Sequence, residues 1–367
     1  MFLKRRIDSS DVSVVVQGSI SDYTRHCLNS IRKFLPRSEI ILSTWTNSNV
    51  SGLSYDVLVQ NIDPKATIFS AYNKYNNLNR ILVSSRAGVN AATRKYTLLL
   101  RNDLVLKNDN ILKIKDVFTK RDKTCSLFHN RIFAYEIFSI KSEIANGYLQ
   151  KSIFHISDWC RFGLTEDLRE LFNIPNVKEP EFSQYMKCHK VDRSTDIFTS
   201  RTWKMSPEQY IISENAKKVF HKLKVHSYLD TRPEVLEASE KFIINNFIVK
   251  SIPEWGIKIM KDDYKNKRIF SFDYCLEGAY LGKNQFIDYK KYIDPKFVLP
   301  FKYTYKDVLK IEKDSVHFRK HLHSAYFPVR TILRYIGEIL SVVFYTVKIV
   351  LKSIYYGTKC IIRRITK

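Results

Sequence analysis

Three polar residues interrupt the most apolar predicted strand of the chain, and two of them are ionisable. Arg101, Asn102 and Asp103 follow the run Tyr-Thr-Leu-Leu-Leu at 96–100, and Leu-Val-Leu resumes at 104–106. Desolvating a carboxylate there costs several kcal/mol unless a cation or hydrogen-bond donors compensate. Asp103 can hold a divalent cation that bridges a diphosphate, and Arg101 can stabilise a phosphate leaving group. An internal Arg101–Asp103 ion pair, or an Asp103 turn cap, is the structural alternative.

Two later segments also concentrate ionisable groups. The segment HISDWCRFGLTEDL at 155–168 holds His155, Asp158, Glu166 and Asp167. In KMSPEQYI at 204–211, the order Ser-Pro-Glu predicts a helix start with Glu208 in its first turn. A glutamate in that position also stabilises a helix by complementing its dipole, so Glu208 has a structural role available beside a chemical one.

The elements that must position these residues alternate between strand and helix over the first 110 residues. Apolar runs predict strands at 12–17, 39–45, 56–61 and 95–106, and helical spacing of apolar residues predicts helices at 23–35 and 76–93. This order favours an α/β fold with a mostly parallel sheet flanked by helices. Ligands of such sheets bind beyond the carboxyl ends of the strands, which here are Gln17-Gly18-Ser19, Ser43-Thr44-Trp45 and Arg101-Asn102-Asp103. Gly18 permits a close backbone approach to a ligand.

The rest of the chain predicts mixed structure without a repeat or a clear linker. We expect short strands in 126–135 and 268–281, and helices at 163–172, 206–223 and 232–249. These segments predict that one domain continues to about residue 320, ahead of a C-terminal region of different composition.

The C-terminal region, 321–367, is basic and amphipathic. From 322 on it carries eight Lys and Arg residues and a single acid, Glu338. On a helical wheel one polar stripe contains Arg330, Arg334, Glu338, Ser341, Lys348, Lys352, Lys359 and Arg363. A spanning helix needs roughly 20 residues nearly free of charge, so we expect helices that lie in the interface of an anionic membrane. Packing on the protein's own core, or an oligomer contact, is the alternative.

The overall charge points to anionic partners. The chain has 61 Lys and Arg against 37 Asp and Glu, a net charge of +24. Nucleic acid, an anionic membrane surface and phosphorylated substrates all fit this excess, and solvated lysine faces are the alternative without a partner.

Several common functional signatures are missing from the sequence. It has no GxGxxG and no GxxxxGK[ST], which disfavours a dinucleotide-binding Rossmann site and a P-loop ATPase. Its six cysteines include no CxxC pair, so we expect reduced, mostly structural cysteines in a cytosolic compartment. The segment MFLKRRIDSS lacks the apolar run of a secretory signal.

The order of motifs resembles the WavE lipopolysaccharide synthesis family, which looks like the GT-A class of nucleotide-sugar glycosyltransferases. The resemblance covers about residues 12–215. The matching pieces are VVVQGSI (14–20), SIRKFLPRSEIILSTW (30–45), Asp63-Pro64, Asn79-Arg80, KYTLLLRNDL (95–104), NRIF (130–133), SDWCRFGLTEDL (157–168) and PEQY (207–210).

This resemblance implies a donor site at the carboxyl edge of the sheet. The Arg-Asn-Asp run takes the place of the GT-A DxD motif, with Asp103 as the ligand of a divalent metal, Mn or Mg. Arg101 stands where that motif has Asp, and Lys65 follows Asp63-Pro64 where Gly is expected. Arg101 and Arg80 are then available to neutralise phosphate in place of the metal. The implied nucleotide-binding residues are Gln17, Gly18, Ser19, Thr44, Asn79, Arg80, Arg101 and Asp103.

The resemblance also implies a later acid that deprotonates the acceptor hydroxyl. Asp158 and Glu208 are the candidates, with Asp158 placed first and Trp159 beside it as an apolar platform for a sugar. Glu166 and Asp167 come next, and capping of the helix that follows is their structural alternative. If the enzyme retains the anomeric configuration, a general base is not required in the same way.

The implied function is a glycosyltransferase that adds a sugar to a lipopolysaccharide core or surface polysaccharide in a bacterium. We expect a GT-A-like domain over 1–320, with a nucleotide-binding half at about 1–110 and an acceptor half at about 111–320. A glycolipid or lipid-linked acceptor and the basic tail place it peripherally at the cytoplasmic face of the inner membrane. The alternatives are a basic nucleic-acid-binding protein, for which no recognition motif is present, and a non-catalytic membrane scaffold on a degenerate transferase fold.

Overall fold

A computed structural model describes most of the chain before residue 299. The described residues are 6–69, 74–145, 148–194, 196, 200–250, 252–260 and 282–298. Apart from Tyr148, the elements discussed below belong to one compact unit, Met1–Ala145 and Leu149–Ile311. The predicted strand at 268–281 and the predicted membrane-associating tail at 321–367 lie outside the described residues.

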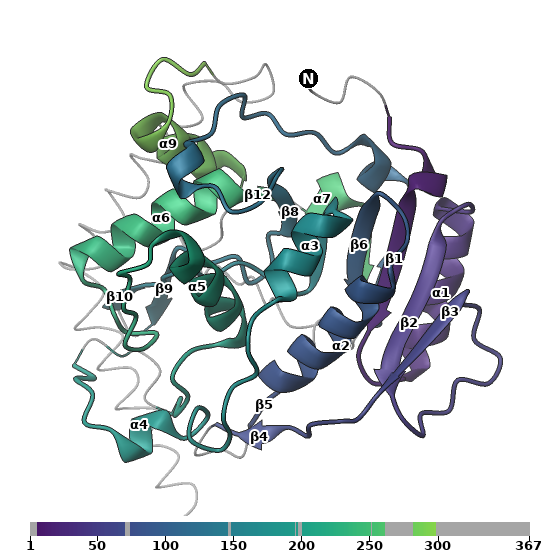
Figure 1. Ribbon diagram of the computed structural model, residues 1–367, viewed down its shortest axis with the longest axis horizontal. Helices are drawn as coiled ribbons and strands as arrows, with labels where there is room; N and C mark the ends of the chain where they lie inside the picture. The colour runs from purple at the N-terminus through teal and green to yellow at the C-terminus, as the bar shows by residue number, and fades with distance from the viewer. Residues whose placement is uncertain are drawn as a thin grey trace, which may run out of the picture. The chain divides into compact units, whose positions relative to one another are not determined.

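A central sheet of seven strands organises this unit, in the order β12-β8-β11-β6-β1-β2-β3 (Figure 1). Strands β1, β2, β3 and β6 are mutually parallel, whereas β11 runs antiparallel to both of its neighbours, β6 and β8. The predicted mostly parallel α/β sheet is therefore confirmed. The strand bounds are β1 Val12–Gln17, β2 Glu39–Trp45, β3 Val57–Asn61, β6 Tyr96–Arg101, β8 Ile132–Tyr135, β11 Cys160–Leu164 and β12 Phe247–Lys250.

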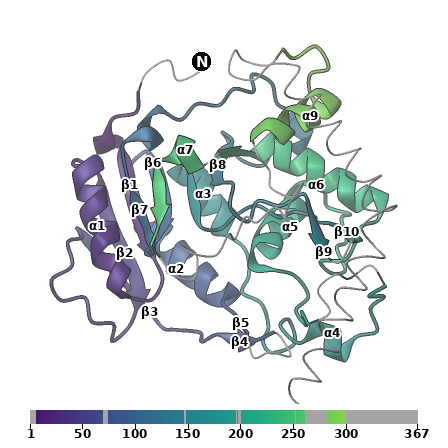
Figure 2. The same ribbon diagram turned by 180° about the vertical axis from the view of Figure 1, so that it is seen from behind.

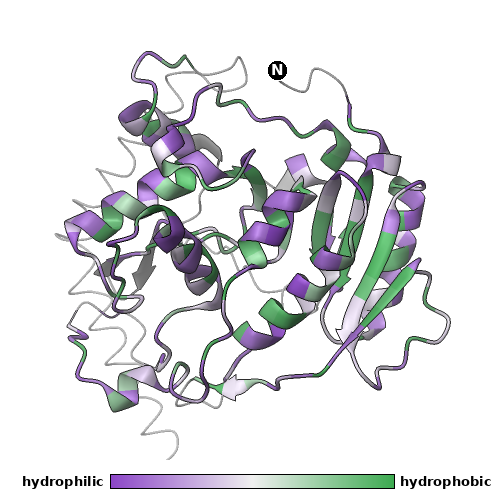
Figure 3. Ribbon diagram, viewed as in Figure 1, coloured by the Kyte–Doolittle hydropathy of each residue, from purple (hydrophilic) through white to green (hydrophobic). Residues whose placement is uncertain are grey.

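Helices cover both faces of the sheet. Helix α1, Asp22–Phe34, lies on one face and α2, Leu78–Ala91, lies on the other (Figures 1 and 2). Side chains alternate along each strand, so Val14 joins the core cluster beneath α1 and Val15 the cluster beneath α2. Strands covered on both faces are mostly apolar, as the green stretches of the central strands in Figure 3 show.

The remaining elements surround this layered core. The other helices are α3 Thr165–Phe172, α4 Tyr185–Cys188, α5 Pro207–Val219, α6 Pro233–Asn246, α7 Ile252–Trp255 and α9 Gly282–Tyr292. Short strands form three pairs. Strand β4 Thr67–Ile68 is antiparallel to β5 Tyr75–Asn76, and β7 Leu104–Leu106 is antiparallel to β13 Ile257–Ile259. The third pair is β9 Ser142–Ala145 with β10 Tyr148–Lys151. Single 3-10 turns lie at η1 Ser9–Asp11, η2 Asn110–Lys113 and η3 Lys123–Cys125.

Three predicted segments need correction. The predicted helix at 232–249 ends at Asn246, because Phe247–Lys250 pairs with β8 as strand β12. The predicted helix at 163–172 begins only at Thr165, since Gly163 and Leu164 complete β11. Within 126–135, only Ile132–Tyr135 is strand. In the first two cases pairing with a distant strand overrides the local helical spacing.

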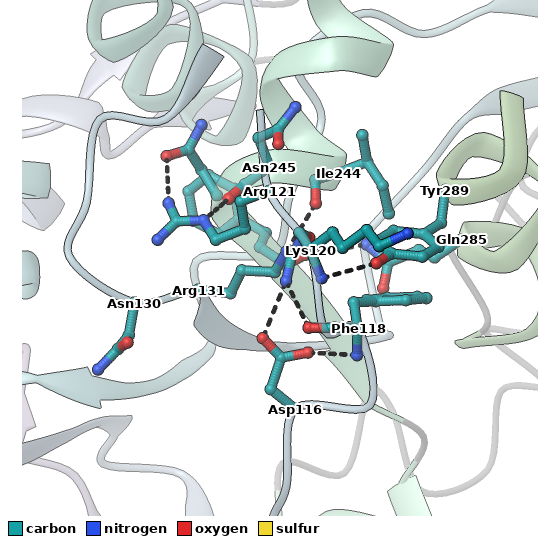
Figure 4. Close-up of polar contacts among 12 residues, drawn as sticks. Asp116, Phe118, Lys120, Arg121, Asn130, Arg131, Ile244, Asn245, Gln285 and Tyr289 are labelled. Carbon is teal, nitrogen blue, oxygen red and sulfur yellow. Dashed lines mark hydrogen bonds and ion pairs between the residues drawn. The ribbon is translucent and has the colours of Figure 1, made fainter. Parts of the chain in front are cut away.

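A buried arginine joins β8 to the segment before it (Figure 4). The Arg131 guanidinium donates to the Asp116 carboxylate at 3.0 Å and to the backbone carbonyls of Phe118, Lys120 and Ile244. Its side chain has no exposed area. Burial raises the pKa of Asp116, while the charge of Arg131 opposes that shift. A buried charge is tolerated when it is paired and fully hydrogen-bonded. This cluster therefore holds the start of β8 against the segment before it and against the end of α6.

Among the helices that the structure describes, none combines the length and the apolar character needed to cross a bilayer.

Candidate functional site

The strand pairing brings the predicted site residues to one edge of the sheet. Gln17 at the end of β1 is in register with Arg101 at the end of β6 and with Ser43 near the end of β2. Strand β11 runs the opposite way, and its first residue, Cys160, is opposite Leu100. The segment just before β11 therefore lies at the same edge as the carboxyl end of β6, and that segment contains Asp158.

Arg101 and Asp103 form an ion pair at this edge. Nε of Arg101 donates to Oδ1 of Asp103 at 3.1 Å, and Nη2 donates to Oδ2 at 2.5 Å. The Asp103 side chain is 8% exposed and that of Arg101 is 25% exposed. The internal pair that the sequence left open is thus present, and it is bidentate, the geometry in which arginine binds carboxylates best.

The indole of Trp159 supports the Arg101 guanidinium. The guanidinium carbon lies 4.1 Å from the ring centroid, and the Arg101 backbone N–H donates to the Trp159 carbonyl at 3.1 Å. Phe138 packs against the same indole with ring centroids 5.1 Å apart. The indole is 4% exposed, so it supports an arginine and is not the open sugar platform that we expected.

Asp158 and Glu208 form a pair of interacting carboxylates next to this arginine. Burial, and then the charge of Glu208, raise the pKa of Asp158 to about 6, against the opposing effects of Arg101 and Arg161. Burial also raises the pKa of Glu208. The Ser206–Pro207 start of α5 sets the position of Glu208, because the Ser206 side chain accepts from the Gln209 backbone N–H as the helix cap.

The charge of Arg161 interacts with both carboxylates of this pair. Arg161 was not among the predicted site residues. It is fully buried, and Nε donates to the Ser157 carbonyl at 2.9 Å. Its Nη1 has no hydrogen-bond partner among the described residues. Burial lowers the pKa of Arg161 to about 10, so the group stays charged at neutral pH, and the charges of Asp158 and Glu208 oppose the shift. A charged residue between Cys160 and Phe162 in an apolar strand was the signal available in the sequence.

A histidine connects the start of α5 to the preceding loop. The carbonyl of Phe138 can only accept, so Nδ1 of His155 donates to it at 2.8 Å. In the neutral ring Nε2 then accepts from the Ser206 hydroxyl at 3.2 Å. This connection holds the N-terminus of α5, and with it Glu208, against the segment that leads to Asp158.

A second arginine is held in the same way on the other side of the Gly18-Ser19 turn. Arg80 donates to both Asp63 oxygens, at 2.9 and 3.0 Å, and its guanidinium carbon lies 5.0 Å from the Trp45 ring centroid. Nη2 of Arg80 and the indole N–H of Trp45 both donate to the Ser19 hydroxyl, at 2.9 and 2.8 Å. Ser19 is exposed and joins the two sides, because the Asn102 side chain donates to its carbonyl.

Gly18 and Lys65, at this edge of the sheet, both have a positive backbone φ. Gly18 has φ 115°, and a side chain added there would meet no atom within 4 Å, so the space beside it is open. Lys65 has φ 65°, and its N–H donates to Asp63 at 2.9 Å. Lysine therefore adopts the turn conformation for which glycine was expected after Asp63-Pro64.

Some predicted binding residues have their side chains engaged inside the fold. Asn79 exchanges two hydrogen bonds with the backbone of Val177, at 3.0 and 2.9 Å. Gln17 accepts from the Ser84 hydroxyl at 2.8 Å, and the buried Thr44 hydroxyl contacts Ser48 at 3.2 Å. The described contacts of these three side chains are with other residues of the fold, so we assign them a structural role at this edge.

The other two acidic candidates, Asp167 and Glu166, also have no described contact with the proposed site. Asp167 is buried and accepts from the backbone N–H groups of His129 and Asn130 at 2.7 and 2.9 Å. Its carboxylate therefore fixes the segment before β8. Glu166 is exposed in the first turn of α3. Neither residue is connected by a described contact to the pair formed by Asp158 and Glu208.

The residues at Asp103 fit a divalent metal poorly. Both carboxylate oxygens accept from one guanidinium, and a dication bound to them would lie against the positive charge of Arg101. Hard cations need several oxygen ligands. In the described ranges, no three His, Cys, Asp or Glu side chains gather closely enough to hold a metal ion.

Comparison with known proteins identifies a protein family and similar solved structures, two of which are described here. The model of the WavE lipopolysaccharide synthesis family matches residues 12–311. No curated protein matches the chain. The catalytic domain of Drosophila beta1,4-galactosyltransferase 7 in complex with xylobiose is similar at 11% identity and a TM-score of 0.23, over 48% of this chain and 60% of that one. A mutant of that Drosophila enzyme with manganese, UDP-Gal and xylobiose is similar at 11% identity and a TM-score of 0.22, over the same 48% and 60%.

Proposed function

The chain belongs to the WavE lipopolysaccharide synthesis family, and on that premise we propose that it is a GT-A-type glycosyltransferase. It transfers a sugar from a nucleotide-sugar donor to a lipopolysaccharide core or surface-polysaccharide acceptor. The observation that carries the proposal is a carboxylate pair, Asp158 and Glu208, beside a fixed guanidinium at the carboxyl edge of the sheet. Glycosyl transfer with inversion uses both elements: a group that accepts the hydroxyl proton, and positive charge that stabilises the phosphate leaving group.

Asp158 is the general base of this proposal. A carboxyl group with a pKa of about 6 is mostly ionised at neutral pH and takes a proton more readily than an ordinary aspartate. Glu208 keeps that pKa high, and Arg101 and Arg161 keep it from rising further. Asp158 therefore removes the acceptor proton as the acceptor oxygen attacks the anomeric carbon of the donor sugar, while the bond from that carbon to the phosphate oxygen breaks and the nucleotide leaves.

The donor lies on the other side of the same edge, along the Gly18-Ser19 turn. The open space beside Gly18 admits a ligand close to the backbone, and Ser19 exposes its side chain there. Arg80 and Arg101 flank the turn, each fixed by an aspartate and a tryptophan. Fixed donors cost little reorganisation when charge develops on the leaving phosphate.

The proposed place of action is the cytoplasmic face of the inner membrane, with the protein peripheral. The net charge of +24 and the basic amphipathic pattern of 321–367 support an anionic surface and a lipid-linked acceptor. Sedimentation with anionic and with neutral lipid vesicles tests this part. We expect the full chain to sediment with the anionic vesicles and a chain truncated after residue 325 to stay in solution. Equal sedimentation of both forms would contradict it.

The central test combines ligand binding with transfer. A thermal-shift screen against UDP, GDP, CMP and CDP identifies the donor nucleotide, because a ligand of the native state raises the melting temperature. Stabilisation by nucleic acid alone would favour the nucleic-acid-binding alternative. With the matching nucleotide-sugar, we expect Asp158→Asn to lose about a hundredfold or more in donor hydrolysis or transfer.

The control for this test is Glu234→Gln. Glu234 follows Pro233 in the first turn of α6, as Glu208 follows Pro207 in α5, but it is exposed and pairs with Arg232. We expect it to retain wild-type activity. Full activity of Asp158→Asn would overturn the assignment of the general base.

A further inference from the structure

Two arginines at the donor edge are held by the same arrangement of partners. In each, an aspartate binds the guanidinium through two of its nitrogens, and a tryptophan ring lies within 4.1–5.0 Å of the guanidinium carbon. One clamp consists of Arg80, Asp63 and Trp45, and the other of Arg101, Asp103 and Trp159. The partners come from different strands and loops, so each guanidinium is fixed by the tertiary fold.

The two clamps meet at Ser19. Arg80 donates to the Ser19 hydroxyl, and Asn102, the residue between Arg101 and Asp103, donates to the Ser19 carbonyl. Gln17, two residues earlier, is in register with Arg101 across β1 and β6. A ligand lying along the Gly18-Ser19 turn therefore has one clamped arginine on each side.

The clamp at Arg101 leaves donor capacity unused. Its Nε and Nη2 are taken by Asp103, whereas Nη1 makes no hydrogen bond within the described part of the chain. A quarter of the side chain is exposed. A guanidinium so restrained loses little conformational entropy when it binds an anion, and its planar fork suits phosphate oxygens.

We propose that the Arg101 clamp, supported by the Arg80 clamp, binds the diphosphate of the donor in place of a divalent metal. Asp103 is then a positioning residue for Arg101 and not a metal ligand. This inference rests on the proposed function, since it concerns the donor site of the same transferase. It follows from the poor fit of Asp103 to a metal: the oxygens that a cation would need already hold the cation that the chain supplies.

The test is calorimetric titration of the full-length protein with UDP, GDP, CDP and ADP, each with EDTA and each with Mn²⁺. We expect at least one nucleoside diphosphate to bind with the same Kd in both conditions. Arg101→Gln should weaken that binding by about tenfold or more in EDTA, because it removes hydrogen bonds to a charged group. Arg101→Lys should recover only part of the loss, since it restores the charge without the planar fork.

The control is Arg37→Gln, which removes an equal charge at the opposite end of the sheet. Arg37 precedes β2 and pairs with Asp8 on the surface. We expect its Kd to match that of the wild type, and circular dichroism to show that every variant is folded.

The outcomes separate this inference from the proposed function. Binding that requires Mn²⁺, and that Asp103→Asn abolishes while Arg101→Gln leaves it intact, would overturn the inference and leave a metal-dependent transferase. The absence of binding for every nucleoside diphosphate in both conditions would overturn the inference, and if CMP also fails to raise the melting temperature in the thermal-shift screen, the proposed function falls with it. Metal-independent binding that Arg101→Gln does not weaken would overturn the role of Arg101 alone.

Discussion

The charge of Glu208, in the first turn of α5, raises the pKa of Asp158, which precedes β11. These two residues are distant in sequence and come from different elements, yet their carboxylates interact at the edge where β6 ends. Two carboxylates in one partly desolvated site cannot both ionise freely, so the pair retains a proton to higher pH than either isolated group would.

The first prediction concerns the pH dependence of transfer. Activity that requires ionised Asp158 should fall on the acid side with an apparent pKa near 6. Glu208→Gln removes the negative charge that raises this pKa, so the acid limb should move to lower pH. Measuring kcat/KM for donor and acceptor across pH in wild type, Glu208→Gln and the matched Glu234→Gln checks this. An acid limb that stays in place in Glu208→Gln would contradict the coupling.

The second prediction concerns stability. The pKa of Asp158 is raised from 3.8 to about 6 on folding, so between these values the native state binds more protons than the unfolded state. The free energy of unfolding should therefore decrease as pH rises through this window, and ionised Asp158 should cost stability at neutral pH. We expect Asp158→Asn to gain about 1 kcal/mol or more at pH about 7.5 in urea denaturation. A loss of stability would show that the ionised carboxylate makes stronger contacts with Arg101 and Arg161 than we infer.

The third prediction concerns the buried Arg131 cluster. Arg131→Leu leaves Asp116 without its cation and frees three backbone carbonyls in the interior, so we expect a loss of about 3 kcal/mol or more. Guanidinium denaturation measures this loss. Arg37→Leu, which breaks an exposed pair, is the control and should leave the denaturation midpoint nearly unchanged. Similar midpoints for the two variants would contradict a structural role for Arg131.

The fourth prediction concerns the closeness of α2 to the sheet. A methyl group at Gly88 would lie 2.3 Å from a Val15 methyl carbon and 3.1 Å from the Ser43 Cβ. Gly88→Ala should therefore destabilise the fold by about 1–3 kcal/mol through overpacking. Gly163→Ala is the matched control, because its added methyl group meets no atom nearer than 3.4 Å. Thermal unfolding of both variants distinguishes them, and equal melting temperatures would refute the packing argument.

The first half of the fold was predictable because its strands are short, apolar and separated by amphipathic helices. The strands at 12–17 and 39–45 have the predicted bounds, and the rule for strand ends selected Arg101 and Asp103 as candidate site residues. The β12 strand was not predictable, because Phe247–Lys250 continues the helical spacing of α6 and becomes a strand only by pairing with β8. Local sequence contains no information on that distant partner.

The candidate site was predictable in composition but not in arrangement. Asp158 and Glu208 were identified by resemblance, yet their interaction depends on β11 lying antiparallel beside β6, which no local pattern encodes. Asn79 and Arg80 are adjacent in sequence but point to different partners, Val177 and Ser19, because successive helical residues face different directions. Arg161 was overlooked because the strand that contains it, β11, was not predicted from the sequence.

The antiparallel course of β11 has a consequence for how this scaffold can change. After Arg101 the chain adds β8 to the sheet and then forms β9 and β10, before it returns to the carboxyl edge of β6 at Cys160. A change of length between β9 and β10 would leave the pairing of Cys160 with Leu100 in place, and with it the position of Asp158 beside Arg101. The segment of β9 and β10 can therefore vary in length among related chains while Arg101 and Asp158 keep their places at the edge of the sheet.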